Sequence, residues 1–84
     1  MKHEKFRSLL DESHSWPDYY EFKFIIHVDN KHLILEKLEG FMIVENPSKK
    51  GNYISIRARK LINSTDEVIE IYEVMSSVDG VISL

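Results

Sequence analysis

The fold is decided by one stretch, Tyr19-Tyr20-Glu21-Phe22-Lys23-Phe24-Ile25-Ile26-His27-Val28. Aromatic and branched residues dominate it and alternate with a period of two, which is typical of a β-strand. One face is apolar without a break: Tyr20, Phe22, Phe24, Ile26 and Val28. The other face is mixed: Tyr19, Glu21, Lys23, Ile25 and His27. This pattern predicts a strand that is buried on one side and partly open on the other.

The residues after this strand predict a helix and then two strands. Asp29 or Asn30 is expected to cap the helix, and Gly40 to end it. Its inward residues are expected to be Ile34, Leu35 and Leu38. Strands are predicted over residues 41–45 and 53–61, joined by the turn-rich segment 46–52.

A second helix is the clearest element of the sequence. Ser64-Thr65-Asp66-Glu67 has the spacing of a capping box, in which Ser64 accepts from the Glu67 amide and the Glu67 side chain reaches back. The apolar stripe expected on this helix is Val68, Ile71, Tyr72, Met75 and Val78. Asp79-Gly80 ends the helix, and residues 81–84 are predicted to form a short last strand.

The order of elements predicts an α+β fold, a ferredoxin-like β-α-β-β-α-β sandwich. In this arrangement a four-stranded antiparallel sheet carries two helices on one face and leaves the other face open. Residues 16–84 are expected to form this single domain. Residues 1–15 are expected to be an N-terminal arm or a short helix, in which Phe6, Leu9 and Leu10 share one face.

Composition limits the classes of protein to consider. A chain of 84 residues suits one domain, and 43% hydrophobic with 30% charged residues describes an ordinary globule. Cysteine is absent, which excludes disulfides, thiolate metal sites and thiol nucleophiles. The start of the sequence lacks the apolar core of a signal peptide, and no apolar run is long enough for a membrane span. We therefore expect a cytoplasmic protein.

Charge is unevenly distributed along the chain, although the net charge is only −3. The segment from Lys49 to Lys60 holds five bases and no acid, and no base follows Lys60. The third strand is thus basic and the following helix acidic. Two solvated faces of opposite charge explain this best, and weak steering of a charged partner is the alternative.

No catalytic or metal-binding pattern stands out, so we expect neither an enzyme nor a cofactor. Ser, His and Asp occur without a nucleophile elbow or another motif that frames them. Of the histidines, His27 and His32 with Asp29 are the only plausible zinc ligands, and no HxxxH spacing supports them. Lys49-Lys50-Gly51-Asn52 could bind an anion, but a hairpin turn that uses Gly51 explains these residues better.

Two segments carry a resemblance to a known family. They are Trp16-Pro17 leading into Tyr20-Glu21-Phe22-Lys23, and residues 47–53, Pro-Ser-Lys-Lys-Gly-Asn-Tyr, leading into Ser55. An apolar helix with a Tyr72-Glu73 pair and a short last strand fits as well. Over about residues 16–84 the chain resembles the YbeD-like family of small bacterial proteins.

The resemblance implies a ferredoxin-like fold related to ACT-type regulatory domains, and it implies no catalytic residues. It also suggests a regulatory role connected with lipoate metabolism. The first helix and the loop after it look shorter here than in the family, by about two turns. An ACT-like ligand site uses the loop between the first strand and the first helix.

We expect a non-enzymatic binding or regulatory module that contacts a protein partner, or a second copy of itself, through the open face of the sheet. The residues expected to form this contact are Tyr53, Arg57 and Arg59, with Lys49 and Lys50 at its edge. One alternative is an ACT-like sensor that binds a small molecule near Asp29, Asn30 and Lys31. A second alternative is RNA binding through the aromatic and basic residues of the same face.

Overall fold

The sheet is assembled around β1, Asp18–His27, in the computed structural model, which describes residues 4–84. The other strands are β2, Met42–Pro47, β3, Tyr53–Ile62, and β4, Ile82–Ser83. Their order across the sheet is β2-β3-β1-β4, and every neighbouring pair is antiparallel. The prediction of an α+β fold with a four-stranded antiparallel sheet is therefore confirmed.

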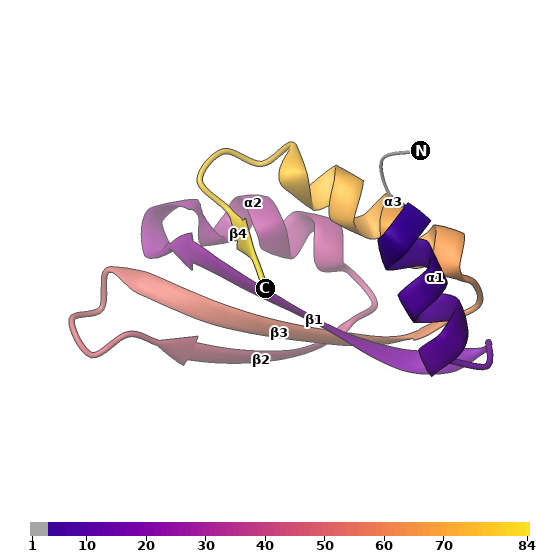
Figure 1. The fold of residues 1–84 in the computed structure, drawn as a ribbon. Helices are drawn as coiled ribbons and strands as arrows, with labels where there is room; N and C mark the ends of the chain where they lie inside the picture. The colour runs from indigo at the N-terminus through magenta and orange to yellow at the C-terminus, as the bar shows by residue number, and fades with distance from the viewer. Residues whose placement is uncertain (1–3) are drawn as a thin grey trace.

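The helices all lie on one side of this sheet (Figure 1). They are α1, Glu4–Ser13, α2, Lys31–Leu35, and α3, Thr65–Ser76; the 3-10 segments η1, Val28–Asn30, and η2, Glu36–Leu38, flank α2. The result is a two-layer arrangement whose second sheet face carries no helix (Figure 1). Within residues 4–84, no helix has the length and apolar character required to cross a membrane.

The core fills the space between the helices and the sheet. The inner face of β1 behaves as its alternation predicts, because Phe22, Phe24 and Ile26 are fully buried. From β3 the buried residues are Ile54, Ile56, Ala58 and Ile62, and from the helical layer they are Leu10, Ile34, Leu38, Val68, Met75 and Val78. The aromatic ring of Tyr72 packs on Phe22, with 5.1 Å between ring centroids.

Within the expected N-terminal arm, residues 4–13 form α1, which packs on the domain; residues 1–3 of that prediction lie outside the described residues. Leu10 of α1 is buried and Phe6 packs edge-on against Tyr72 of α3, with 5.6 Å between ring centroids. Arg7 forms an ion pair with Asp66 at the start of α3. Leu9, which was expected on the same inward face, is 60% exposed, because the contact with α3 is narrower than the apolar spacing suggests.

The expected cap of the helix after β1 is wrong. Asn30 makes no side-chain capping bond to α2. Instead the ring of His27 accepts from the Asp29 amide at 3.2 Å, so the chain leaves β1 through the 3-10 turn η1. Gly40 follows η2 with a φ of 87°, a conformation that favours glycine, as the predicted helix end requires.

The predicted capping box of α3 is confirmed for the hydrogen bond to Ser64, but the hydrogen bond to the Glu67 side chain comes from a different amide. Ser64 Oγ accepts from the Glu67 amide at 3.2 Å. The Glu67 carboxylate accepts from the amide of Asn63, at 3.4 Å, rather than from the amide of Ser64. Both bonds satisfy backbone donors at the start of the helix, which explains why the boundary was predictable.

Candidate functional site

The candidate site is the open face of the sheet, which we define by the strand residues that point away from the helices. The register of the strands assigns to it Tyr19, Glu21, Lys23, Ile25, His27, Met42, Val44, Asn46, Tyr53, Ser55, Arg57, Arg59, Leu61 and Ile82. Their neighbours along each strand point into the core, since successive side chains of a strand alternate. Of the residues expected to bind a partner, Tyr53, Arg57 and Arg59 lie on this face and are exposed.

Large apolar side chains are concentrated on the open face. Of the nine large hydrophobic residues that are exposed in the described chain, six belong to it: Tyr19, Met42, Val44, Tyr53, Leu61 and Ile82. They come from all four strands, and each is between 44% and 55% exposed. Of these six residues, only the two tyrosines are expected on this face from the sequence. Exposed apolar surface that is shared by several strands is typical of a contact surface.

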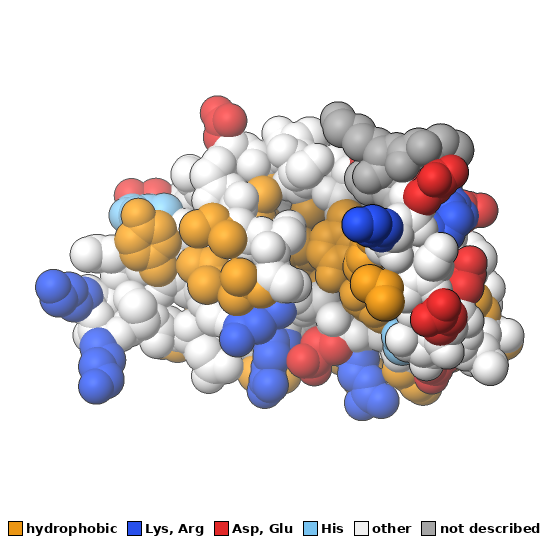
Figure 2. All heavy atoms as spheres, in the orientation of Figure 1, with side chains coloured by type: hydrophobic (Ala, Val, Ile, Leu, Met, Phe, Trp, Pro, Cys, Tyr) orange, Lys and Arg blue, Asp and Glu red, His pale blue; other side chains and the backbone are white. Residues whose placement is uncertain are grey.

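The charge of the open face is predominantly basic. Lys23, Arg57 and Arg59 lie on it with a single acid, Glu21. Figure 2 shows Lys and Arg side chains along the lower margin of the molecule, the side of the sheet away from the helices. The acid Glu45 of β2 faces the other way and binds the ammonium group of Lys31, with 3.0 Å between Nζ and Oε1.

Two aromatic contacts organise the side chains of this face. The guanidinium carbon of Arg59 lies 4.7 Å from the centre of the Tyr19 ring, a cation–π arrangement that holds both residues against the sheet. The ring of His27 meets Tyr53 edge-on, with 5.4 Å between centroids. These contacts restrict the side chains before any partner binds, which reduces the entropy lost on binding.

The turn between β2 and β3 presents Lys49 and Lys50 at one end of the open face, and both are exposed. The backbone of this turn is hydrogen-bonded internally. The Gly51 amide donates to the Ser48 carbonyl at 2.9 Å, and the Ser48 amide donates to the Tyr53 carbonyl at 2.8 Å. Gly51 has a φ of 75°, so the turn itself accounts for the glycine. The Gly51 amide is therefore not directed at an anion.

The residues of the alternative ligand site lie at the end of β1 and the start of α2. Lys31 is engaged with Glu45, and Asp29 lies 3.5 Å from the His27 ring. The segment from β1 to α2 is a 3-10 turn, and nothing in its contacts gathers Asp29, Asn30 and Lys31 around one point. Among residues 4–84, no three His, Cys, Asp or Glu side chains are grouped so that they could hold a metal ion.

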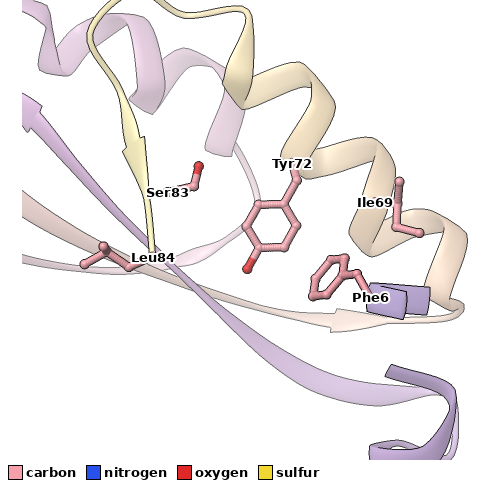
Figure 3. Close-up of a pocket in the computed structure, with 5 residues that line it drawn as sticks. All are labelled: Phe6, Ile69, Tyr72, Ser83 and Leu84. Atoms are coloured by element: carbon pink, nitrogen blue, oxygen red, sulfur yellow. The ribbon is translucent and has the colours of Figure 1, made fainter. Parts of the chain in front are cut away.

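A groove on the helical side of the sheet was not anticipated from the sequence. Phe6, Ile69, Tyr72, Ser83 and Leu84 line it, with a volume of about 300 Å³ (Figure 3). The hydroxyl of Tyr72, one of the lining residues, lies 3.2 Å from the hydroxyl of Tyr20. Burial and this hydroxyl contact raise the pKa of Tyr72 far above its ordinary value. The groove exists because α1 packs beside α3, which is a long-range contact.

A family model described as "Protein of unknown function (DUF493)" matches residues 11–84. The chain belongs to the DUF493 family. The match spans all four strands, α2 and α3, and it begins within α1. No curated protein and no solved structure matches the chain.

Proposed function

We propose that this protein is a non-enzymatic binding or regulatory module that contacts a protein partner, or a second copy of itself, through the open face. The observation that supports the proposal is the composition of that face, where six exposed apolar residues surround the basic residues Lys23, Arg57 and Arg59. Aromatic residues, methionine and arginine are the types enriched in protein interfaces. The expected partner surface is apolar, with acidic residues placed to meet these three bases.

The aliphatic residues of the open face favour a protein over RNA as the partner. A sheet that binds RNA stacks bases on aromatic rings. Here Met42, Val44, Leu61 and Ile82 supply much of the exposed apolar surface, and these side chains offer no ring for stacking. The ring of Tyr19 is already covered on one side by Arg59.

We also propose a more specific fold type, family and cellular location for the protein. The strand order β2-β3-β1-β4, with α2 between β1 and β2 and α3 between β3 and β4, supports a ferredoxin-like architecture. The segments around Trp16-Pro17 and residues 47–53 support a YbeD-like, bacterial origin. The absence of cysteine supports a cytoplasmic location.

The test is a comparison of wild type with the double variant Arg57→Glu/Arg59→Glu. Sedimentation velocity first measures self-association, and a pull-down from lysate followed by mass spectrometry then identifies bound proteins. A captured protein is purified and its affinity for both chains is measured. We expect the double variant to stay folded by circular dichroism and to lose most of the affinity.

The matched control is Lys5→Glu/Lys37→Glu, which makes the same change of charge on the helical side of the molecule. It should leave the affinity nearly unchanged, since these lysines lie on α1 and η2. Equal binding by wild type and the Arg57/Arg59 variant would remove the open face as the contact surface. An affinity for an RNA probe that falls steeply as the salt concentration rises would instead favour RNA binding by this face.

A further inference from the structure

The open face has two neighbouring bases at its centre. β1 and β3 share five pairs of opposite residues on this face, and the middle pair is Lys23 and Arg57. Both side chains are exposed. Residues that lie opposite each other in an antiparallel pair have Cβ atoms about 4.5–5.5 Å apart, and like charges in such a pair destabilise the sheet. The centre of the face is therefore a site of unfavourable charge in the free protein.

Within residues 4–84, no acid lies opposite either of these two bases. Glu21, the acid of the open face, lies opposite Arg59. On its β2 side Arg57 lies opposite Val44. None of the ion pairs recorded among residues 4–84 includes Lys23 or Arg57. The positive charge of this pair is thus available to an anion from outside the domain.

Arg59, the third base of the open face, is engaged within the domain. It lies opposite Glu21, and its guanidinium group covers the ring of Tyr19. Protection of a sheet edge does not explain the central pair either, because Lys23 and Arg57 belong to the two inner strands of the order β2-β3-β1-β4. An acid of a partner therefore gains most at the central pair.

Apolar side chains adjoin the central pair on the same surface. Met42 and Val44 of β2 are about half exposed, and Ile25 of β1 is half-buried. Basic and apolar side chains meet along this margin of the molecule (Figure 2). A carboxylate that reaches the pair under a covering partner leaves bulk water, and opposite charges attract more strongly in such surroundings than in water.

The central pair also bears on which of two occupants, a second copy or a different protein, covers the open face. In a two-fold dimer the same surface patch of both copies meets. A dimer centred on the open face would bring Lys23 and Arg57 of one copy against the same bases of the other, and such contacts between like charges are strongly unfavourable. A different protein can instead supply the missing acid.

The shape of the basic band favours a helix as the covering element. Lys23, Arg57 and Arg59 all lie on β1 and β3. Adjacent strands are about 4.8 Å apart, and a helix with its side chains is about 10 Å across. One helix therefore covers both inner strands and places apolar side chains on Val44 and Ile25. Helices are one of the two kinds of layer that cover an apolar sheet face in folded proteins.

We propose that the open face binds an amphipathic helix of a different protein, and that a carboxylate at the centre of the helix's apolar face binds Lys23 and Arg57. This inference rests on the proposed function, which assigns the open face to a protein contact, and it adds the chemistry of the partner. Lys23 and Arg57 determine the preference for an acid, whereas the apolar residues around them supply buried area.

Urea unfolding of the free protein tests the unfavourable charge at the central pair. Arg57→Glu places an acid opposite Lys23, whereas Arg59→Glu places one opposite Glu21. Arg57→Glu should therefore unfold at a higher urea concentration than Arg57→Gln, by about 0.3 M or more. The order should be reversed at residue 59, although the change of net charge is the same. The same order at both positions would overturn the proposal.

The binding probe is a capped helical peptide of about 18 residues, with leucines along one face and a glutamate at the centre of that face. Two control peptides carry glutamine or lysine at this position. Amide chemical shifts of the isotope-labelled full chain locate the contact and give the affinity. The glutamate peptide should bind about fivefold or more tightly than the glutamine peptide.

Charge exchange provides the matched variants. Lys23→Glu/Arg57→Glu should prefer the lysine peptide to the glutamate peptide. Lys5→Glu/Lys37→Glu makes the same change of net charge on the helical side and should keep the preference of the wild type for glutamate. An unchanged preference for glutamate in Lys23→Glu/Arg57→Glu would overturn the role of the central pair.

The proposal is also overturned if the glutamate peptide causes no shift at about 1 mM, or if sedimentation velocity shows copies of the wild-type chain associating through the open face. Failure of the proposed function gives a different result, because a captured protein would then bind wild type and Arg57→Glu/Arg59→Glu alike. A captured protein that loses affinity for that variant but binds Lys23→Gln/Arg57→Gln as tightly as wild type would overturn only the role of the central pair.

Discussion

The indole nitrogen of Trp16 donates a hydrogen bond to the hydroxyl of Thr65, at 2.9 Å, across 49 positions of the chain. Thr65 is 5% exposed, and its hydroxyl in turn donates to the Asp11 carboxylate at 2.5 Å. This short network joins the end of α1, the segment before β1 and the first residue of α3. It fixes α1 beside α3, and the groove over β1 depends on that placement.

Thr65→Val should destabilise the protein by about 1–2 kcal/mol. The substitution keeps the shape of the side chain but leaves the half-buried indole N–H of Trp16 without its acceptor. Urea unfolding measures the loss, and Thr65→Ser, which retains a hydroxyl, should recover most of it. A Thr65→Val variant as stable as wild type would show that the network contributes nothing to the fold.

Asp18 should make the stability depend on pH in the acid range. The side chain of His14 hydrogen bonds to the Asp18 carboxylate, with 2.8 Å between Nδ1 and Oδ2, and lowers the pKa of Asp18 below its ordinary value of 3.8. The folded state therefore holds the proton less readily than the unfolded state. The stabilising contribution is present above the ordinary pKa and is lost as pH falls through the lowered one.

Urea midpoints measured from about pH 6 down to about pH 2 check this dependence. Asp18→Asn should lose less stability in acid than wild type does. His14→Gln should also lose less, because it removes the hydrogen bond that lowers the pKa of Asp18. Parallel curves for wild type and Asp18→Asn would contradict the assignment.

Tyr72 should make the protein sensitive to strong alkali. Burial and the Tyr20 hydroxyl raise the pKa of Tyr72, so the folded state keeps this proton more tightly than the unfolded state. The contribution is complete below the ordinary tyrosine pKa of 10.0 and is lost as pH rises through the raised value. Tyrosinate absorbance should show that Tyr72 does not ionise until the protein unfolds. Tyr72→Phe should weaken the alkaline loss of stability, and an equally steep loss would count against this account.

Phe22→Ala should cost about 3–5 kcal/mol, a large share of the total stability of a small domain. Phe22 has no exposed surface and contacts the rings of Tyr20, Phe24, Phe41 and Tyr72. The matched control is Tyr19→Ala on the open face of the same strand, where the side chain is 48% exposed. Thermal unfolding should show a much lower stability for Phe22→Ala than for Tyr19→Ala. Similar losses of stability in the two variants would mean that the faces of β1 are assigned wrongly.

Local patterns account for the parts of the fold that were predicted correctly. The two faces of β1 follow from alternation, because a strand directs successive side chains to opposite sides whatever its neighbours are. The start of α3 follows from Ser64 and Glu67, whose hydrogen bonds span a few residues. The turn at Gly51 follows in the same way from a backbone conformation that other residues rarely adopt.

Long-range contacts account for the parts that were missed. Ile69 is 6% exposed although it lies outside the predicted stripe of α3, because α1 packs beside α3 and widens its buried face. The predicted last strand, residues 81–84, pairs through only two residues, Ile82 and Ser83. The number of residues that pair depends on how β4 approaches β1, and no local pattern encodes that.

The sequence by itself determined which side chains of β1 and β3 face the core, where α3 begins, and that Tyr53, Arg57 and Arg59 lie on the open face. These properties depend on periodicity and on hydrogen bonds between near neighbours. Only the tertiary structure decided that Met42, Leu61 and Ile82 join them on one surface, and that an apolar groove forms between α1, α3 and β4. Those features arise from strand order and from the packing of α1 on α3, which bring distant segments together.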